Sequence, residues 1–363
     1  SQNLIKNLLE LDREDEFVLF MTKEDAKELK LLNQKSEIRN PKFKVVITDI
    51  PHYSLAEQTK LGRIIENEKL DLMHFLNFNY PVKYKGKFIV TIHDLTLLFY
   101  PETAQRTNIF KQSIFKYILK KGCQNAEKII AVSKNTKKDI IEKFQIPNSK
   151  IQVIYEAADD KIFKNVSEGA VESLKKKYQI KSPLLLYVGQ FRYHKNIEGL
   201  IKAYRILKKE TPCQLAILGK SNLDNQEIFS DIIRPGFVSD RDLASWYKMA
   251  SVFVFPSFYE GFGLPGLEAM SAGLPVVASR KGSLPEIYQK AAIYFDPFNP
   301  TDIADKIKMV LKDKKLQKRL VEKGKAVSKQ YSWRKTAEET LDLYKEINSK
   351  FKGKLTYGCS FIY

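Results

Sequence analysis

Two carboxylates bracket a glycine-rich stretch in the second half of the sequence. The segment from Tyr259 to Ser279 reads YEGFGLPGLEAMSAGLPVVAS, with Glu260 and Glu268 on either side of three glycines. Pro265 suits the first turn of a helix, where its missing N–H costs nothing. The apolar run SVFVFP leads into this loop. A strand, a glycine loop and a helix N-terminus are typical of a phosphate site, because free N–H groups and the helix dipole face the anion.

The two carboxylates predict hydroxyl ligands beside that phosphate. Glu260 lies in the loop and Glu268 one turn into the helix, so they face different parts of one ligand. Like charges repel, so neither carboxylate is expected to touch the phosphate itself. We therefore expect a ligand that carries a sugar and a ribose. The alternative is a structural glycine turn with two surface acids.

The strands that would position these residues fall into two series. The first comprises EFVLFM, FKVVITDI, KLDLMHFL, KFIVTIHD, AEKIIAVS and SKIQVIY, and the second LLLYVG, QLAILG, IRPGFV, SVFVFP, LPVVAS and AIYFDP. Near-continuous apolar runs indicate strands buried on both faces, as in parallel sheets. Helical stretches such as residues 57–68 and 106–122 alternate with them, which predicts two doubly wound α/β domains. Ligands bind at the carboxyl ends of such strands, so we expect a cleft between the domains.

The expected domains are residues 1–165 and 166–350, because residues 159–181 have few strand features. Residues 351–363 form a tail that includes the apolar KLTYGCSFIY, either a displaced strand or a sequence artefact. The sequence opens directly on a helix, without the strand that usually begins a doubly wound domain.

Composition excludes several classes of protein. The chain has 363 residues, of which 44% are apolar and 12% aromatic, as in globular proteins. It lacks both an apolar run of 18 residues and a signal peptide, so we expect a cytoplasmic protein. Cys123, Cys213 and Cys359 are too scattered for a disulfide framework or a metal site. The net charge of +18 favours anionic partners, or reflects a composition that is simply rich in lysine.

Several ordered motifs resemble glycosyltransferase family 4, whose members have the GT-B fold of two Rossmann-like domains facing across a cleft. YEGFGLPGLEAMSAGLPVVAS resembles the E-x7-E signature of the family. The other matching segments are VTIHDLTLLFYPE, AEKIIAVSKNTKKDI, IQVIYEAADDKIF, LYVGQFRYHKNIEGLIKAY, GFVSDRDLASWYKMASVFVFPSFYEGFG and GSLPEI. The resemblance covers about residues 1–350, and the motifs are most similar to mannosyltransferase-like members from bacterial surface-polysaccharide pathways. It implies that the final helix, around residues 333–350, crosses back to pack on the first domain.

The resemblance implies a retaining enzyme that moves a hexose, with mannose the first expectation. The donor would be GDP-mannose or a UDP-hexose, bound by the second domain, and the acceptor a glycan or lipid-linked glycan, bound by the first. It implies no cofactor, no metal ion and no nucleic acid partner. The alternatives are an epimerase-like sugar-nucleotide enzyme of the same fold, or a basic membrane-binding or nucleic-acid-binding protein without activity.

The resemblance also assigns roles to individual residues. The catalytic residues are His93 and Glu260, and the donor-binding residues are Gly189, Arg192, Lys195, Gly261, Phe262, Gly263, Leu264 and Glu268. Glu268 matches the acid that holds the ribose, Glu260 the acid that contacts the donor sugar, and Lys195 the cation on the diphosphate. Gln190 stands where the family often has arginine, so Arg192 is our candidate for the second cation.

His93 ends the strand KFIVTIHD, at the edge where the cleft is expected. The resemblance implies that it approaches the donor sugar, where a neutral ring could hydrogen-bond a hydroxyl. The alternative is a histidine whose partner is the neighbouring Asp94.

The segment RTNIFKQSIFKYILKKG, residues 106–122, has five basic residues and no acids. A basic amphipathic helix is typical of membrane-surface binding, which would place the enzyme on the inner face of the plasma membrane. The alternative is an ordinary domain helix with one apolar face.

The family has a first strand and a glycine-rich loop beneath the donor phosphates. These would precede Ser1, so we expect this chain to lack them and to bind its donor weakly.

Overall fold

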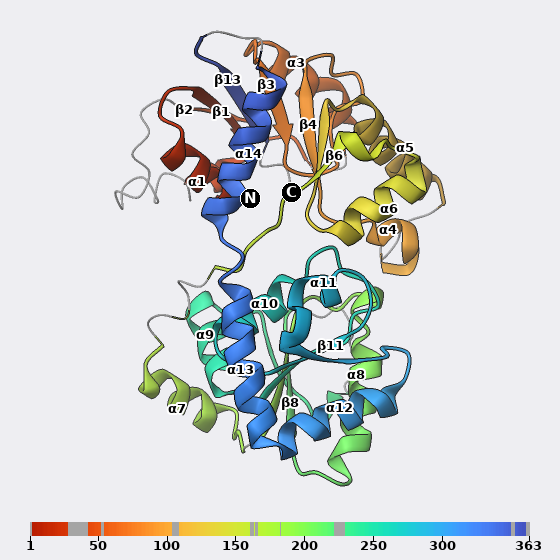
Figure 1. The fold of residues 1–363 in the computed structure, drawn as a ribbon, viewed down its shortest axis with the longest axis vertical. Coiled ribbons are helices and arrows are strands. Elements are labelled where there is room, and N and C mark those ends of the chain that lie inside the picture. Colours follow the sequence, from red (N-terminus) through yellow and green to blue (C-terminus); the bar gives the residue numbers. More distant parts are fainter. Residues whose placement is uncertain are drawn as a thin grey trace. The chain divides into compact units, whose positions relative to one another are not determined.

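Two parallel sheets contain all the described strands of the protein (Figure 1). The structure, a computed structural model, describes residues 2–27, 43–51, 54–103, 109–159, 163, 166–181, 183–220, 229–349 and 353–360. The first sheet has the order β2-β1-β13-β3-β4-β5-β6, and the second β12-β11-β10-β7-β8-β9. The strands β3, β4 and β10 are buried at every position, as expected where helices cover both faces of a sheet. The prediction of two doubly wound sheets is confirmed.

The strands of the first sheet are β1 (Glu16–Met21), β2 (Phe43–Ile47), β3 (Leu72–Phe75), β4 (Phe88–Ile92), β5 (Lys128–Ala131), β6 (Ile151–Val153) and β13 (Thr356–Ser360). Its helices and turns are α1 (Gln2–Leu11), η1 (Glu57–Leu61), α3 (Gly62–Glu66), α4 (Thr96–Phe99), α5 (Ile109–Asn125), α6 (Lys134–Phe144), η3 (Asn148–Lys150) and α14 (Trp333–Ile347).

The strands of the second sheet are β7 (Leu184–Val188), β8 (Gln214–Leu218), β9 (Ile233–Gly236), β10 (Val252–Phe255), β11 (Val276–Ser279) and β12 (Ala292–Phe295). Its helices and turns are η2 (Pro101–Thr103), α7 (Glu168–Lys177), η5 (Tyr193–Lys195), α8 (Ile197–Lys208), α9 (Asp240–Met249), α10 (Leu264–Ser271), α11 (Leu284–Tyr288), η7 (Gln289–Ala291), α12 (Pro300–Lys312) and α13 (Lys314–Ser328).

The chain passes between two compact units more than once. Unit 1 comprises residues 1–98, 107–156 and 332–363, and unit 2 residues 99–106 and 157–331. The division after Glu156 precedes the expected boundary at residue 165, because β6 ends at Val153 and the chain then leaves the first sheet. The short segment 99–106, which interrupts unit 1 in sequence, belongs to unit 2.

Strand β13 is an interior strand of the first sheet, between β1 and β3 (Figure 1, the blue arrow among red and orange ones). It runs parallel to both neighbours, with Tyr357 opposite Phe17 and Leu72. Residues 356–360 of the tail therefore form a strand of the sheet, and the rest of KLTYGCSFIY after Ser360 lies outside the described residues. A sheet without this strand would leave the backbone edges of β1 and β3 unpaired in the interior, which is costly.

Helix α14 packs against α1 in unit 1, beside β13. The apolar positions of α1 (Leu4, Ile5, Leu8 and Leu9) join Leu341 and Tyr344 of α14 in one core cluster. The ring of Tyr344 lies 4.8 Å from that of Tyr357, which in turn lies 5.6 Å from Phe17. Aromatic packing thus ties β13 to helix α14 and strand β1.

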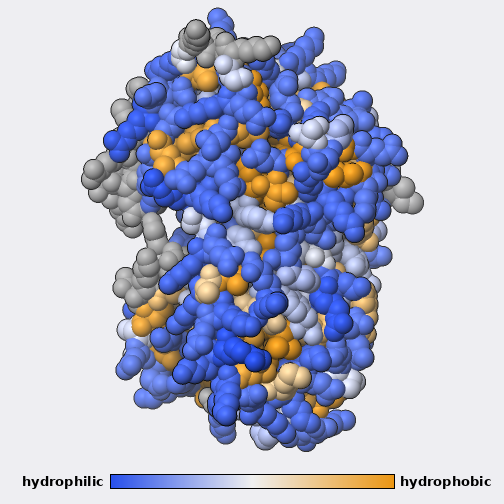
Figure 2. Space-filling view, viewed as in Figure 1, coloured by the Kyte–Doolittle hydropathy of each residue, from blue (hydrophilic) through white to orange (hydrophobic). Residues whose placement is uncertain are grey.

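Hydrophilic residues cover most of the face shown in Figure 2, and apolar residues form separate patches on it. This distribution agrees with the high content of lysine, since charged side chains favour water.

The change Tyr357→Ala tests the place of β13 in the core. Tyr357 is fully buried, so its truncation should lower the free energy of unfolding by about 3–5 kcal/mol, the cost for large aromatic side chains. Urea unfolding followed by circular dichroism measures this loss. Lys354→Ala, which removes only an exposed ion pair with Glu16, should cost about 1 kcal/mol at most. Equal unfolding midpoints for the two variants would show that β13 is not part of the folded sheet.

Candidate functional site

The loop between β10 and α10 carries the glycine motif in unit 2. Gly263 is the N-cap of α10 with φ 96°, a left-handed conformation that favours glycine, and Pro265 lies in the first turn. A Cβ at Gly263 would lie 2.6 Å from both Leu284 Cδ2 and Tyr288 Oη. The helix predicted to begin near Pro265 is α10 (Leu264–Ser271), so the N–H groups of its first turn are presented beside this loop.

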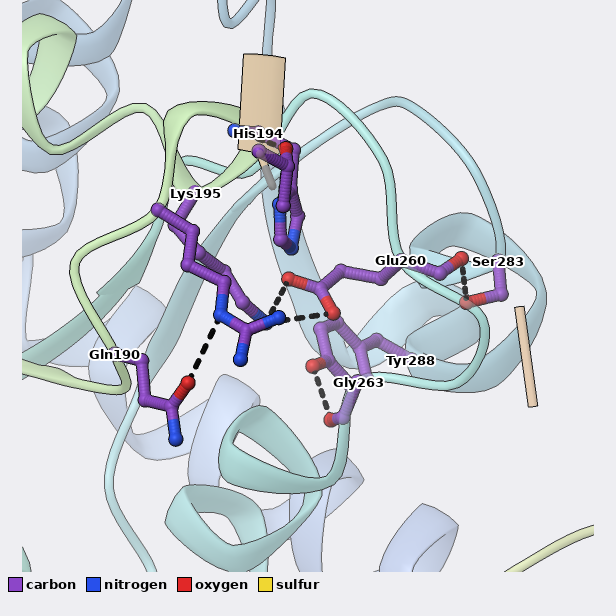
Figure 3. Close-up of polar contacts among 9 residues, drawn as sticks. Gln190, His194, Lys195, Glu260, Gly263, Ser283 and Tyr288 are labelled. Carbon is purple, nitrogen blue, oxygen red and sulfur yellow. Dashed lines mark hydrogen bonds and ion pairs between the residues drawn. The ribbon is translucent and has the colours of Figure 1, made fainter. Parts of the chain in front are cut away.

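Glu260 and Lys195 contact each other directly (Figure 3). The Lys195 ammonium donates to both carboxylate oxygens of Glu260, at 2.7 and 2.9 Å. Lys195 ends the η5 turn that follows β7, and Glu260 follows β10, which pairs with β7. The sheet therefore brings together two residues that the sequence places far apart. Both are mostly buried, so the carboxylate needs this cation.

The loop after β11 supports the backbone of Glu260 from another side. Ser283 Oγ donates to the Glu260 carbonyl oxygen at 3.0 Å, and the Ser283 N–H donates to the same oxygen at 3.3 Å (Figure 3). Gly282 has φ 60°, and a Cβ there would lie 2.9 Å from that carbonyl oxygen. The Tyr288 hydroxyl donates to the carbonyl of Gly263. Gly282 and Ser283 of GSLPEI, with Tyr288 directly after it, therefore hold the glycine loop in its conformation.

Glu268 accepts a hydrogen bond from a tyrosine that no sequence motif identifies as its partner. The Tyr247 hydroxyl, from helix α9, donates to Glu268 Oε2 at 2.9 Å. Burial raises the pKa of Glu268, and the bond from Tyr247 opposes this rise. The same burial, with the nearby charge of Glu268, raises the pKa of Tyr247, so the hydroxyl stays protonated as a donor.

Arg192 and His194 lie just before Lys195 in the sequence, and their surroundings differ. Arg192 is exposed, and its Nε donates to Gln190 Oε1 at 2.9 Å. His194 is buried, and its Nδ1 lies 2.9 Å from Thr103 Oγ1, in the segment 99–106 of unit 2. Burial, with the charges of Lys195 and Arg192, lowers the pKa of His194 to about 3, so this ring is neutral.

His93 lies in unit 1, directly after β4, and both of its ring nitrogens have partners. Nε2 donates to the carbonyl of Leu76 at 2.8 Å, and Nδ1 lies 3.1 Å from Glu156 Oε1. Asp94 is not its partner, since this carboxylate accepts from the N–H of Thr96 at 2.7 Å. Both ring nitrogens of His93 are therefore taken up within unit 1, by Leu76 and Glu156, and the partner is not the neighbouring Asp94 that the sequence suggested as the alternative.

The structure thus brings Lys195 and Glu260 into contact and places Gly263 and Glu268 on the same loop and helix. Reasoning from the sequence missed Tyr247, Ser283 and Glu156. Each lies inside a motif with family resemblance, but no spacing in the sequence marks it as a partner of an acid or a histidine. Among the residues that the structure describes, no group of three or more His, Cys, Asp or Glu side chains could hold a metal ion.

Two sequence profiles match the chain. The profile described as Glycosyltransferase Family 4 matches residues 3–161, and the one described as Glycosyl transferases group 1 matches residues 171–327. O-antigen chain mannosyltransferase B of Escherichia coli is 30% identical over 307 residues, which cover 82% of this chain and 80% of that protein.

Solved structures with low sequence identity share the fold. A glycosyltransferase from Rickettsia africae superposes with a TM-score of 0.70 at 20% identity and covers 93% of this chain and all of its own. Anabaena HepE in complex with UDP and glucose gives a TM-score of 0.72 at 16% identity, over 94% of this chain and 95% of its own.

The change Gly282→Ala tests how tightly the loops pack around Glu260. The positive φ and the close carbonyl oxygen should lower the free energy of unfolding by about 1–3 kcal/mol. Chemical denaturation measures the loss. Gly169→Ala is the control, since its Cβ meets nothing within 4 Å in helix α7 and alanine favours a helix by roughly 0.5–1 kcal/mol. A Gly282→Ala protein as stable as the Gly169→Ala protein would contradict the described packing.

Proposed function

Because the chain is a hexosyltransferase of glycosyltransferase family 4 with the GT-B fold, we propose that it moves mannose from a nucleotide diphosphate sugar to a glycan acceptor with retention of configuration. The proposed acceptor is a glycan or lipid-linked glycan of a surface polysaccharide. The mannosyltransferase from Escherichia coli supports mannose and thus GDP-mannose as donor, while the UDP complex of HepE keeps a UDP-hexose as the alternative.

The observation that carries this proposal is the contact between Lys195 and Glu260 beside the N-terminus of α10. In the proposed complex the ammonium of Lys195 meets the diphosphate, and the N–H groups of Gly261, Phe262 and Gly263 add positive dipoles. Gly189, Arg192 and Leu264 complete the proposed donor site. Fixed cations and N–H groups stabilise the charge that develops on a diphosphate leaving group, so no metal ion is required.

The two acids take different parts of the donor in this proposal. Glu268, on helix α10, accepts hydrogen bonds from the ribose hydroxyls, and Glu260 accepts them from the sugar. Both oxygens of Glu260 already bond Lys195, which suits a residue that positions the sugar better than one that attacks it. We therefore infer a front-face reaction.

In this reaction the bond between the anomeric carbon and the β-phosphate oxygen breaks, and the acceptor oxygen bonds the same carbon from the same face. The acceptor proton passes to the leaving diphosphate. As the resemblance implies, we propose His93 as the second catalytic residue.

The change Glu268→Ala tests the donor site. Losing a charge-assisted hydrogen bond to a ribose hydroxyl costs about 1.5–3 kcal/mol, so the affinity for nucleoside diphosphate should fall about ten-fold or more. Calorimetry with GDP and UDP measures binding. Release of nucleoside diphosphate from GDP-mannose and UDP-hexoses, with and without EDTA, measures turnover.

Glu322→Ala is the matched control, because it removes an exposed carboxylate from helix α13 without a role in the proposed site. Equal nucleotide affinity for the two variants would contradict the assignment of Glu268. An inverted product anomer would exclude the front-face reaction, and loss of turnover in EDTA would exclude the metal-free one.

We further propose that helix α5 binds an anionic membrane surface. No described helix is long and apolar enough to cross a membrane. On α5, Ile114 is 44% and Tyr117 53% exposed, although both are apolar or aromatic. Lys111, Lys116 and Lys120 are exposed on the same helix. Exposed apolar side chains among lysines favour the boundary between lipid headgroups and acyl chains, where a lipid-linked acceptor would be presented. Arg106, at the start of the predicted segment, lies outside the described residues.

Neutralising this helix tests the membrane proposal. The variant carries glutamine at Lys111, Lys116, Lys120 and Lys121. Each lysine near an anionic surface contributes about 1 kcal/mol, so binding should fall at least ten-fold at low salt. Sedimentation with vesicles that contain phosphatidylglycerol measures it.

The control has the same change in charge on helix α13. It carries glutamine at Lys314, Lys315, Lys318 and Lys323, all of them exposed. If both variants lose the same affinity for vesicles, only net charge matters, and α5 is an ordinary helix of unit 1.

A further inference from the structure

His93 and Glu156 meet at the carboxyl edge of the first sheet. His93 follows β4 directly, Leu76 follows β3, and Glu156 lies in the segment that leaves β6. The imidazole contacts the Leu76 carbonyl through Nε2 at 2.8 Å and the Glu156 carboxylate through Nδ1 at 3.1 Å. The ring therefore bridges two separate strand ends and cannot turn without losing a contact.

The chemistry of these contacts places the protons. A carbonyl oxygen only accepts, so Nε2 of His93 must carry a hydrogen. In a neutral ring Nδ1 would then direct a lone pair at the Glu156 carboxylate, and the two would repel. The contact is attractive when Nδ1 also carries a proton, which makes His93 an imidazolium paired with a carboxylate.

The electrostatics of the surroundings support this pairing. Burial opposes protonation of His93, but the charge and the hydrogen bond of Glu156 raise its pKa overall. Burial likewise favours a neutral Glu156, and the charge of His93 lowers its pKa overall. The pair therefore stabilises unit 1 most fully between the ordinary pKa of a glutamate, 4.5, and that of a histidine, 6.5. This contribution is lost when the pH rises through the raised pKa of His93 or falls through the lowered pKa of Glu156.

His74, on β3, is a second histidine close enough to interact electrostatically with His93. It bonds Tyr344 and Thr91, and burial lowers its pKa to about 3, so it is neutral and adds no charge beside His93.

The arrangement leaves His93 only partly open to ligands. Its side chain is 31% exposed and that of Glu156 15%, and both line a small cavity of about 30 Å³ with Thr91 and Trp333. Because both N–H groups bond the protein, the ring can offer a ligand only its C–H groups and its charge. A positive charge attracts the oxygen atoms of hydroxyls and phosphates.

We propose that Glu156 is a positioning residue of the transfer reaction, which keeps His93 as a fixed imidazolium and sets the plane of its ring. His93 then takes part through its charge and not through a free nitrogen. This inference rests on the proposed function, in which His93 is a catalytic residue. Nothing in the sequence around Glu156, in IQVIYEAADDKIF, marks this role.

The test is the change Glu156→Gln, read first by NMR in the absence of any ligand. The chain has four histidines, and His74 and His194 stay neutral above pH 4. A His93→Gln spectrum identifies the resonance of His93. Loss of an opposite charge at this distance should lower the pKa of His93 by at least about one unit. The basic limb of the profile of kcat against pH should move to lower pH by the same amount.

Glu142→Gln is the control, since this exposed carboxylate on α6 pairs only weakly with Lys138, at 3.8 Å. It should leave the pKa of His93 and the pH profile unchanged. A merely structural role of Glu156 would lower kcat at every pH without moving the limb, which would overturn the positioning role. An unchanged pKa of His93 in Glu156→Gln would overturn the ion pair itself. If the wild type turns over no nucleotide sugar, the proposed function fails, while the NMR result still decides the pairing.

Discussion

The candidate donor site depends on one interaction, the pair of hydrogen bonds between Lys195 and Glu260. A buried carboxylate without a partner is costly, so this contact determines where the loops after β7 and β10 can lie. Ser283, after β11, holds the backbone of the same glutamate. Three neighbouring strands of the second sheet, β11, β10 and β7, thus direct their carboxyl ends toward one residue. In the proposed complex a diphosphate would offer Lys195 a second anion, while the remaining lone pairs of Glu260 accept from hydroxyl groups.

Two other mostly buried acids also have a partner that compensates for their burial. Glu268 accepts from Tyr247, whose hydroxyl cannot ionise in its buried surroundings, and Glu156 pairs with His93 in unit 1. In each case a side chain from a different element provides the compensation. The partner determines the net charge at each acid. A cation neutralises the carboxylate, whereas a neutral hydroxyl leaves its negative charge in place.

Much of the fold could be predicted because apolar runs such as FIVTI and VFVF identify strands buried on both faces. The glycine loop and α10 also follow from local residues, chiefly Pro265 and Gly263. Strand β13 could not be placed, since the sequence TYGCS shows that it can be a strand but not which strands it pairs with. Tyr247 looks like a core residue of an amphipathic helix, and its hydroxyl gives no periodic signal. The protonation of His93 depends on Glu156, which only the assembled sheet brings to it.

The position of β13 has a consequence for folding order. Unit 2 consists almost entirely of the continuous stretch 157–331, so its contacts form over modest distances along the chain. Unit 1 is completed by a strand whose neighbours are remote in sequence: the N–H of Leu355 bonds the carboxylate of Asp15 across 340 residues. Closing so long a loop costs entropy before any contact offsets it. Refolding should therefore finish in unit 2 first, with the sheet of unit 1 open between β1 and β3 until β13 arrives.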